Sequence, residues 1–139
     1  MRILCLDVGE KNIGAAVSDP LGLTAQGIDV IKRENKHKDI LKIKDLVENY
    51  EVQEILLGYP VNLNGTVGEK AREVENFKKM LEKNFSIPVS LWDERLTTSA
   101  ARRTLLEADV SRSARKKVID KLAAVYILNS YLQRKNVEK

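Results

Sequence analysis

The sequence has few of the residues that build many enzyme sites, with one cysteine and one histidine among 139 residues. This shortage excludes most zinc sites, Ser-His triads and Cys-His dyads, unless His37 served alone. The single cysteine, Cys5, cannot form an internal disulfide bond. Because no secretory signal is recognised either, the sequence predicts a protein of the reducing cytoplasm. Any catalysis is therefore expected to depend on carboxylates.

Long hydrophobic runs are also missing. No apolar run approaches the ~20 residues that span a bilayer, and the first one meets an acid at Asp7. A membrane span and a membrane partner are therefore not expected. The composition, 43% hydrophobic and 32% charged, is typical of a globular protein. The length fits a single domain, residues 1–139.

Charge is distributed unevenly along the chain. Residues 1–94 hold 13 basic and 16 acidic side chains, a net charge of −3, whereas residues 95–139 hold 11 basic and 4 acidic ones, a net charge of +7. A basic C-terminal part favours a polyanionic partner, and nucleic acid fits better than a membrane surface. The alternative is that these charges only keep the protein soluble.

The hydrophobic pattern predicts three strands, over residues 2–9, 13–19 and 23–31, joined by short turns into an antiparallel meander. Helical and strand patterns then alternate. The expected elements are a helix over 39–50, a strand over 54–58, a helix opened by a capping box at Thr66 and Glu69, a strand over 88–92, and helices over about 97–107 and 113–135. This order predicts an α/β fold with a five-stranded mixed sheet, a meander plus two parallel strands, and helices on both faces.

Three acids are candidates for chemistry. Asp7 ends a central apolar strand, where a carboxylate is costly unless it is paired or bound to a cation. Glu94 directly follows another strand. Asp93 is an alternative candidate, because side chains alternate along a strand and only one of these two neighbours can face the site. Asp120 falls opposite the expected apolar stripe of the last helix, beside small residues, although a surface acid paired with lysines is the plainer interpretation. That stripe is Val118, Leu122, Val125, Tyr126 and Leu132.

Carboxylates from separate elements are suitable ligands for Mg²⁺ or Mn²⁺. Two such ions can activate a water molecule and stabilise the leaving oxygen of a phosphodiester. Basic side chains around the acids would then hold phosphate. The candidates for nucleic-acid binding are Lys11, Asn62, Arg95, Arg112, Arg115, Lys116 and Lys117. The loop at residues 62–66 presents amides at a helix start, although a plain helix cap explains it equally well.

Four blocks, in order along the chain, resemble the YqgF (RuvX) family. They are Leu6-Asp7-Val8-Gly9 with residues 13–19, the loop Gly58-Tyr59-Pro60 to Thr66, Asp93-Glu94-Arg95-Leu96-Thr97-Thr98, and residues 117–124 around Asp120-Lys121-Leu122-Ala123-Ala124. Each block is weak alone, and together they are specific. The resemblance covers nearly the whole chain.

The resemblance implies an RNase H-like fold related to RuvC-type resolvases. It further implies a nuclease dependent on Mg²⁺ or Mn²⁺ that processes the 5′ end of precursor 16S rRNA in the bacterial cytoplasm. By position, the catalytic and metal-binding acids of the family fall on Asp7, Glu94 and Asp120. Many members of the wider superfamily have a fourth acid, and Ala123 and Ala124 stand where it would be expected. A weak second metal site, with slow turnover or a need for a partner, would follow.

Other functions remain open on the sequence alone. The chain could be a Holliday junction resolvase that cuts branched DNA, for which a homodimer would supply paired active sites. It could instead be a non-catalytic RNA-binding factor in ribosome assembly. The start of the chain also resembles the phosphate-binding hairpin of the actin and sugar-kinase fold, but that fold needs two such domains. Precursor rRNA is the preferred partner.

Overall fold

The computed structural model describes residues 1–62, 64–96 and 112–137, with the backbone alone at 112–120 and 137. Along the chain the elements are β1 (Arg2–Val8), β2 (Asn12–Ser18), β3 (Ala25–Lys32), α1 (Lys36–Asn49), β4 (Val52–Tyr59), α2 (Glu69–Asn84), β5 (Val89–Asp93), the 3₁₀ helix η1 (Glu94–Leu96) and α4 (Arg112–Val137). The helix expected over residues 97–107 lies outside the described residues.

The five strands form one mixed sheet in the order β3-β2-β1-β4-β5. The pairs β1–β2 and β2–β3 are antiparallel, and the pairs β1–β4 and β4–β5 are parallel. This is the expected meander followed by two parallel strands. Because β1 lies in the middle, its carboxyl end meets the carboxyl ends of β4 and β5 at one edge of the sheet, where ligands collect in folds of this kind.

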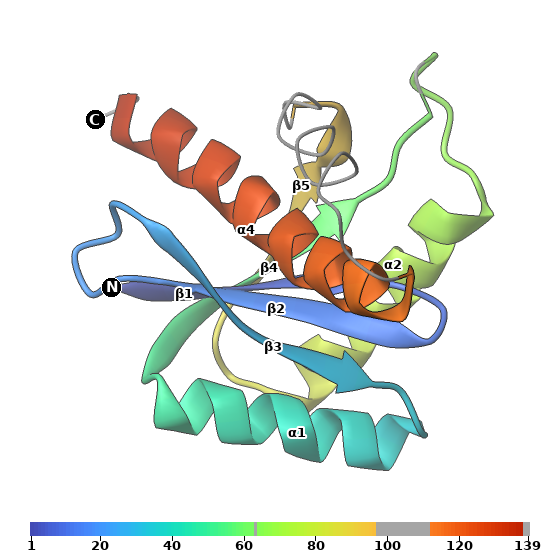
Figure 1. Ribbon diagram of the computed structural model, residues 1–139, viewed down its shortest axis with the longest axis horizontal. Coiled ribbons are helices and arrows are strands. Elements are labelled where there is room, and N and C mark those ends of the chain that lie inside the picture. The colour runs from blue at the N-terminus through green and yellow to red at the C-terminus, as the bar shows by residue number, and fades with distance from the viewer. Residues whose placement is uncertain (63, 97–111, 138–139) are drawn as a thin grey trace.

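Helices cover both faces of the sheet, as predicted (Figure 1). On the α1 and α2 face, the even-numbered residues of β1, Leu4 and Leu6, pack with Ile43 of α1 and with Phe77 and Leu81 of α2. On the α4 face, the odd-numbered residues Ile3 and Cys5 pack beneath α4. The alternation of side chains along β1 therefore places Asp7 on the α4 face.

The buried face of α4 differs from the expected stripe. Ala123, Ala124, Ile127, Leu128 and Leu132 are the buried residues. By contrast, Leu122, Val125 and Tyr126 are only half-buried. The expectation favoured large side chains, whereas the helix lies close to the sheet and needs small ones at its contact points. Among the described side chains of α4, Leu132 is the residue that both patterns share, whereas the side chain of Val118 lies outside them.

Polar contacts along α4 fix its direction across the sheet. The Tyr131 hydroxyl donates to Glu54 Oε2 at 2.8 Å, and Lys135 Nζ lies 3.7 Å from Glu54 Oε1. The Ala25 amide donates to Asn129 Oδ1 at 3.2 Å. These contacts anchor the second half of α4 near the start of β3 and β4, so the first half lies toward the carboxyl end of β1 (Figure 1).

Two helix starts differ from the sequence prediction. The first helix begins at Lys36, because the Asn35 side chain accepts a hydrogen bond from the Lys38 amide. The capping box at Thr66 and Glu69 was wrong: α2 begins at Glu69 with Gly68 as its N-cap and no side-chain cap bond. Thr66 instead bonds to the loop before the helix. Over the described residues, no helix has the length and hydropathy that crossing a bilayer requires.

Candidate active site at the carboxyl ends of the parallel strands

Asp7 is a half-buried acid near the end of β1. It pairs in register with Gly14 of β2. On the other side, the ladder between β1 and β4 ends at Leu6 and Leu57, so the next position of β4 beside Asp7 is Gly58. Asp7 thus lies between two glycines, which leave space above the sheet on the α4 side.

Glu94 lies over Gly58. A Cβ atom at Gly58 would come within 3.1 Å of Glu94 Oε1 and within 2.8 Å of Ile127 Cδ1 on α4. The missing side chain at Gly58 therefore makes room both for the Glu94 carboxylate and for the approach of α4. Since Gly58 is beside Asp7, the structure brings Asp7 and Glu94 together on one face of the sheet.

Cys5 lies on the same face of the sheet as these two acids. Its thiol is fully buried on the α4 face. Burial raises the pKa of the Cys5 thiol well above its usual range, and the negative charges of Asp7 and Glu94 raise it further. Both carboxylates are therefore close enough to act on the same buried atom, and the thiol stays protonated at neutral pH.

Asp93 takes a different orientation from its neighbour Glu94. Its carboxylate accepts hydrogen bonds from Arg95 Nη2 at 2.7 Å and from Arg95 Nε at 3.0 and 3.1 Å. It also accepts a hydrogen bond from the backbone amide of Arg95 at 2.9 Å. The Arg95 hydrogen bonds lower the pKa of Asp93, and the same pair raises the pKa of Arg95. Of the two adjacent acids, Glu94 is thus the one over Gly58, beside Asp7.

The third predicted acid, Asp120, lies on α4, and its side chain is outside the described residues. Carboxylate oxygens are the donors that Mg²⁺ and Mn²⁺ prefer, so Asp7 and Glu94 fit such a cation in donor type. Among the described side chains, no group of three or more His, Cys, Asp or Glu residues is placed to hold a metal ion.

The predicted nucleic-acid contacts fall in three places. Lys11 is exposed in the turn between β1 and β2, at the Asp7 end of the sheet. Asn62 and Arg95 are exposed and line one pocket. The remaining residues are in the first two turns of α4, where their side chains are outside the described part of the chain. They are Arg112, Arg115, Lys116 and Lys117.

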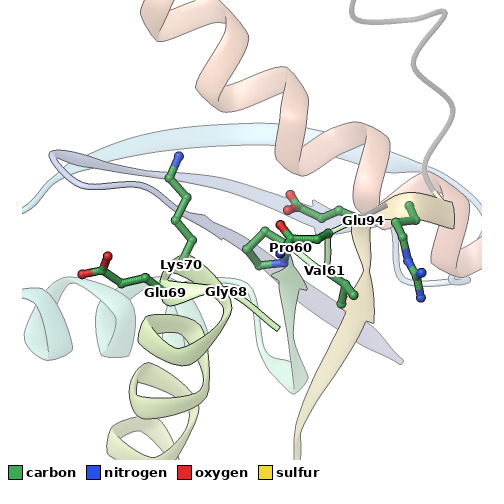
Figure 2. A pocket seen from close by; sticks show the side chains of 8 residues that line it. Pro60, Val61, Gly68, Glu69, Lys70 and Glu94 are labelled. Atoms are coloured by element: carbon green, nitrogen blue, oxygen red, sulfur yellow. The ribbon is translucent and has the colours of Figure 1, made fainter. Parts of the chain in front are cut away.

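That pocket, here called the Glu94 pocket, has a volume of about 430 Å³. Its lining consists of Pro60, Val61, Asn62, Gly68, Glu69, Lys70, Glu94 and Arg95. Figure 2 shows Lys70 rising from the first turn of α2, with Pro60 between it and Glu94, while Glu69 points away from Glu94. Sequence reasoning missed Lys70, because no local signal shows that the first turn of α2 lines the same pocket as Glu94.

The loop before α2 is held by its own polar groups. The Asn62 amide donates to the Thr66 carbonyl at 3.0 Å, and the Gly65 amide donates to the Asn62 carbonyl at 2.8 Å. Gly65 has a φ of 86°, which favours glycine. The Thr66 amide donates to Asn64 Oδ1 at 3.1 Å. These amides close a turn, so Gly65 and Thr66 serve neither as the helix cap nor as a ready phosphate cradle.

Comparison with known proteins assigns the family. The family model described as "RuvX: Holliday junction resolvase" matches residues 1–134. The chain belongs to the RuvX family. A relative from Clostridium acetobutylicum, named "Putative pre-16S rRNA nuclease", is 54% identical over 132 residues, which are 95% of this chain and 98% of the relative. A relative of the same name from Listeria monocytogenes is 54% identical over 138 residues, 98% of this chain and 100% of the relative.

Solved structures identify the fold of this RuvX family member. RuvC from Thermus thermophilus, in complex with a Holliday junction substrate, superposes with a TM-score of 0.60 at 11% identity, covering 97% of this chain and 96% of that one. The fowlpox virus Holliday junction resolvase has a TM-score of 0.54 at 17% identity, covering 96% and 99%. The expected RNase H-like fold of the RuvC type is confirmed.

Proposed function

We propose that this RuvX family member is a divalent-metal-dependent nuclease that hydrolyses phosphodiester bonds in structured nucleic acid, with the 5′ end of precursor 16S rRNA as its substrate. The observation that carries the proposal is that Glu94 lies over Gly58, the β4 residue beside Asp7, where β1, β4 and β5 end. The names of relatives that match almost the whole chain support the choice of substrate. We propose the cytoplasm as its location, where ribosomes are assembled.

Asp7, Glu94 and Asp120 are the proposed catalytic and metal-binding acids. Positions 123, 124 and 127 follow Asp120 by three, four and seven residues, so on a helix all four share one face. Ala123, Ala124 and Ile127 are buried against the sheet. The direction of α4 also carries its first half toward the carboxyl end of β1. Both features support a third acid near the first two.

In this proposal the three carboxylates hold Mg²⁺ or Mn²⁺, and when bound the cation would supply an activated water and stabilise the leaving oxygen of the phosphodiester. Without a cation, the negative charges of the acids repel one another. The buried protonated Cys5 thiol beneath them adds no further charge. Lys11, Asn62, Arg95 and the basic residues at the start of α4 contact the nucleic-acid backbone.

Two small side chains on the buried face of α4 affect the expected rate of cleavage. Ala123 and Ala124 are buried on the sheet side of α4. No acid can act from these positions, where the wider superfamily often has a fourth one. We therefore propose that the second metal site is weak, so turnover is slow or depends on a partner.

The test is cleavage of a precursor 16S rRNA fragment and of a four-way DNA junction, each with and without Mn²⁺. We expect cation-dependent cleavage of the RNA. Asp7→Asn should reduce its rate by about 100-fold or more, since a catalytic cation supplies several kcal/mol and 1.36 kcal/mol is tenfold in rate. Asp45→Asn, an exposed acid on α1 across the sheet from α4, is the matched control and should cleave normally.

Each alternative function has its own outcome in this test. Cleavage of the junction but not of the RNA would favour the Holliday junction resolvase, which the family description supports. RNA binding that is insensitive to EDTA, without cleavage, would favour a non-catalytic assembly factor. Cleavage that is unchanged in folded Asp7→Asn would reject the proposed active site.

A further inference from the structure

The ion pair between Asp93 and Arg95 borders the Glu94 pocket. Two oxygens of Asp93 accept hydrogen bonds from Nε and Nη2 of Arg95 at 2.7 to 3.1 Å. The side chains are 26% and 38% exposed, respectively. An ion pair this exposed contributes little to folding stability, because water screens the attraction. Its effect is geometric, since a two-point contact fixes the plane of the guanidinium.

The fixed guanidinium turns its other edge toward the pocket loop. Asp93 occupies Nε and Nη2, whereas Nη1 lies 3.8 Å from where a Cβ of Gly65 would be. Among the described hydrogen bonds of Arg95, those of the side chain all go to Asp93. The Nη1 edge of Arg95 is thus directed at the β4–α2 loop, beside the pocket that Glu94 also lines.

Lys70 provides a second cation in the lining of this pocket. It is exposed and rises from the start of α2, on the other side of Pro60 from Glu94 (Figure 2). A phosphate entering the pocket would be repelled by the Glu94 carboxylate. The cations Lys70 and Arg95, which line the same pocket, offset that repulsion.

We propose that the Glu94 pocket receives a backbone phosphate of a nucleic-acid strand, bound by Arg95 and Lys70, and that Asp93 is a positioning residue that orients Arg95 for this contact. This inference rests on the proposed function, since it places the phosphate next to a proposed catalytic acid. Neither Lys70 nor Asp93 had a role in that function. Asp93 is negatively charged and would by itself repel a phosphate, whereas in this proposal it promotes phosphate binding by orienting Arg95.

Because Asp93 is negatively charged, the direction in which its removal changes nucleic-acid binding tests the inference. If Asp93 acted only as a negative charge near a polyanion, its removal would strengthen nucleic-acid binding. If Asp93 orients Arg95, its removal weakens binding, because the guanidinium loses its fixed plane. The two roles therefore predict opposite changes in the dissociation constant.

The experiment measures binding of a fluorescein-labelled RNA hairpin with single-stranded ends by anisotropy, in EDTA, over a range of salt concentrations. We expect Asp93→Asn, Lys70→Ala and Arg95→Ala each to weaken binding by about three- to tenfold. Arg95→Ala and Lys70→Ala should each reduce the salt slope by about one. Adding Asp93→Asn to Arg95→Ala should cause no further loss, because Asp93 acts through Arg95.

Asp45→Asn, which removes an exposed acid on α1, is the matched charge control and should not weaken binding. Tighter binding by Asp93→Asn, or an equal loss when Arg95 is already alanine, would overturn the inference. If Asp93→Asn does not fold, Arg95→Lys replaces it. A lysine keeps the charge but cannot form the two-point contact, so binding should still weaken, and wild-type affinity would overturn the inference.

The binding result is separable from the proposed nuclease activity. Wild-type protein that binds RNA through Arg95 and Asp93 but never cleaves it would reject the nuclease and support the inference. Cleavage at wild-type level together with tighter binding by Asp93→Asn would reject the inference and leave the nuclease. No RNA binding at all would overturn the inference as well as the choice of RNA as the substrate.

Discussion

Single carboxylates serve three different purposes in this chain. Glu94 lies above Gly58, where the sheet leaves space for it, and Asp7 is beside Gly58 on the same face. Asp93 binds Arg95, and Asp19 closes the turn between β2 and β3 by accepting amide hydrogen bonds. Residue type alone does not separate these purposes, because each is an acid at or near a strand end. The groups that surround each acid in the fold separate them.

Asp19 provides a prediction at this scale. Its carboxylate accepts hydrogen bonds from the backbone amides of Leu23 and Thr24, both at 2.7 Å, and of Leu21 at 3.3 Å. The Thr24 amide is the largest cause of a lowered pKa at Asp19. A lowered folded-state pKa means that the stabilisation is present above the unfolded-state pKa of about 3.9 and is lost as the pH falls through the folded value.

We therefore expect Asp19→Ala to lower the free energy of unfolding at pH 7, by an amount that shrinks below about pH 4. Urea unfolding of wild type and variant between pH 7 and pH 3 measures this difference. Asp19→Asn is the control, since its amide oxygen still accepts a hydrogen bond but does not titrate. A difference between wild type and Asp19→Ala that is constant over the range would contradict the prediction.

The helix α4 connects the site with the rest of the fold. Over the described side chains, its buried face includes Ala123 and Ala124, and Ile127 lies against Gly58. Small side chains on both surfaces let the helix lie close to the sheet, so Glu94 and Ile127 share the space above one glycine. Close packing of this kind makes the position of Glu94 sensitive to a single added methyl group.

Gly58→Ala tests this packing. The new Cβ would come within 2.8 Å of Ile127 Cδ1 and within 3.1 Å of Glu94 Oε1, closer than ordinary contacts. We expect the free energy of unfolding to fall by about 1–3 kcal/mol, as for other overpacked cores, and the nuclease rate to fall because Glu94 must move. Thermal unfolding and the cleavage assay measure the two effects.

A second substitution separates stability from activity. Ile127→Val removes the Cδ1 atom that meets the new methyl group, so Gly58→Ala with Ile127→Val should regain part of the lost stability. The contact with Glu94 remains, so the cleavage rate should stay low. Full recovery of both quantities would contradict the view that Gly58 makes room for Glu94.

The whole molecule has two contrasting features, a cluster of acids at the proposed site and a basic C-terminal part. Residues 95–139 carry a net charge of +7, against −3 for residues 1–94. Acids at the site repel phosphate unless a cation binds there, whereas the basic part attracts it. Binding of a divalent cation and binding of nucleic acid are therefore expected to support each other.

Thermal unfolding in Mn²⁺ tests cation binding without an activity assay. A ligand that binds only the folded protein at about 100 times its dissociation constant adds about 2.7 kcal/mol of stability, which is several degrees in Tm for a chain of this size. We expect such a rise in Mn²⁺ for wild type and its loss in Asp7→Asn. Sodium chloride of equal ionic strength is the control. An equal rise in Asp7→Asn would place the cation elsewhere.

The sheet was predictable because its signals are local. The apolar runs around Leu4 and Leu56, the turn residues between them and the alternation of strands with helices led to the mixed sheet. The acids Asp7 and Glu94 were predictable as candidates, since each stands at or just after a strand end. Glu94 was preferred to Asp93 only through the family resemblance.

Other features were not predictable from local signals. The capping box at Thr66 failed because Thr66 bonds within its own loop. The stripe around Leu122 and Tyr126 failed because helical periodicity shows which residues share a face, but not how close that face comes to the sheet. Such features depend on distances between segments far apart in the chain.

By itself, the sequence determined the order of the elements, the faces of each strand and the acids available for chemistry, because periodicity and turn residues act over a few neighbours. Only the tertiary structure decided that Glu94 shares the space above Gly58 while Asp93 holds Arg95. It also decided that Lys70 and Arg95 line one pocket. These contacts depend on which side chains from distant segments come close on folding, and the local sequence does not show those distances.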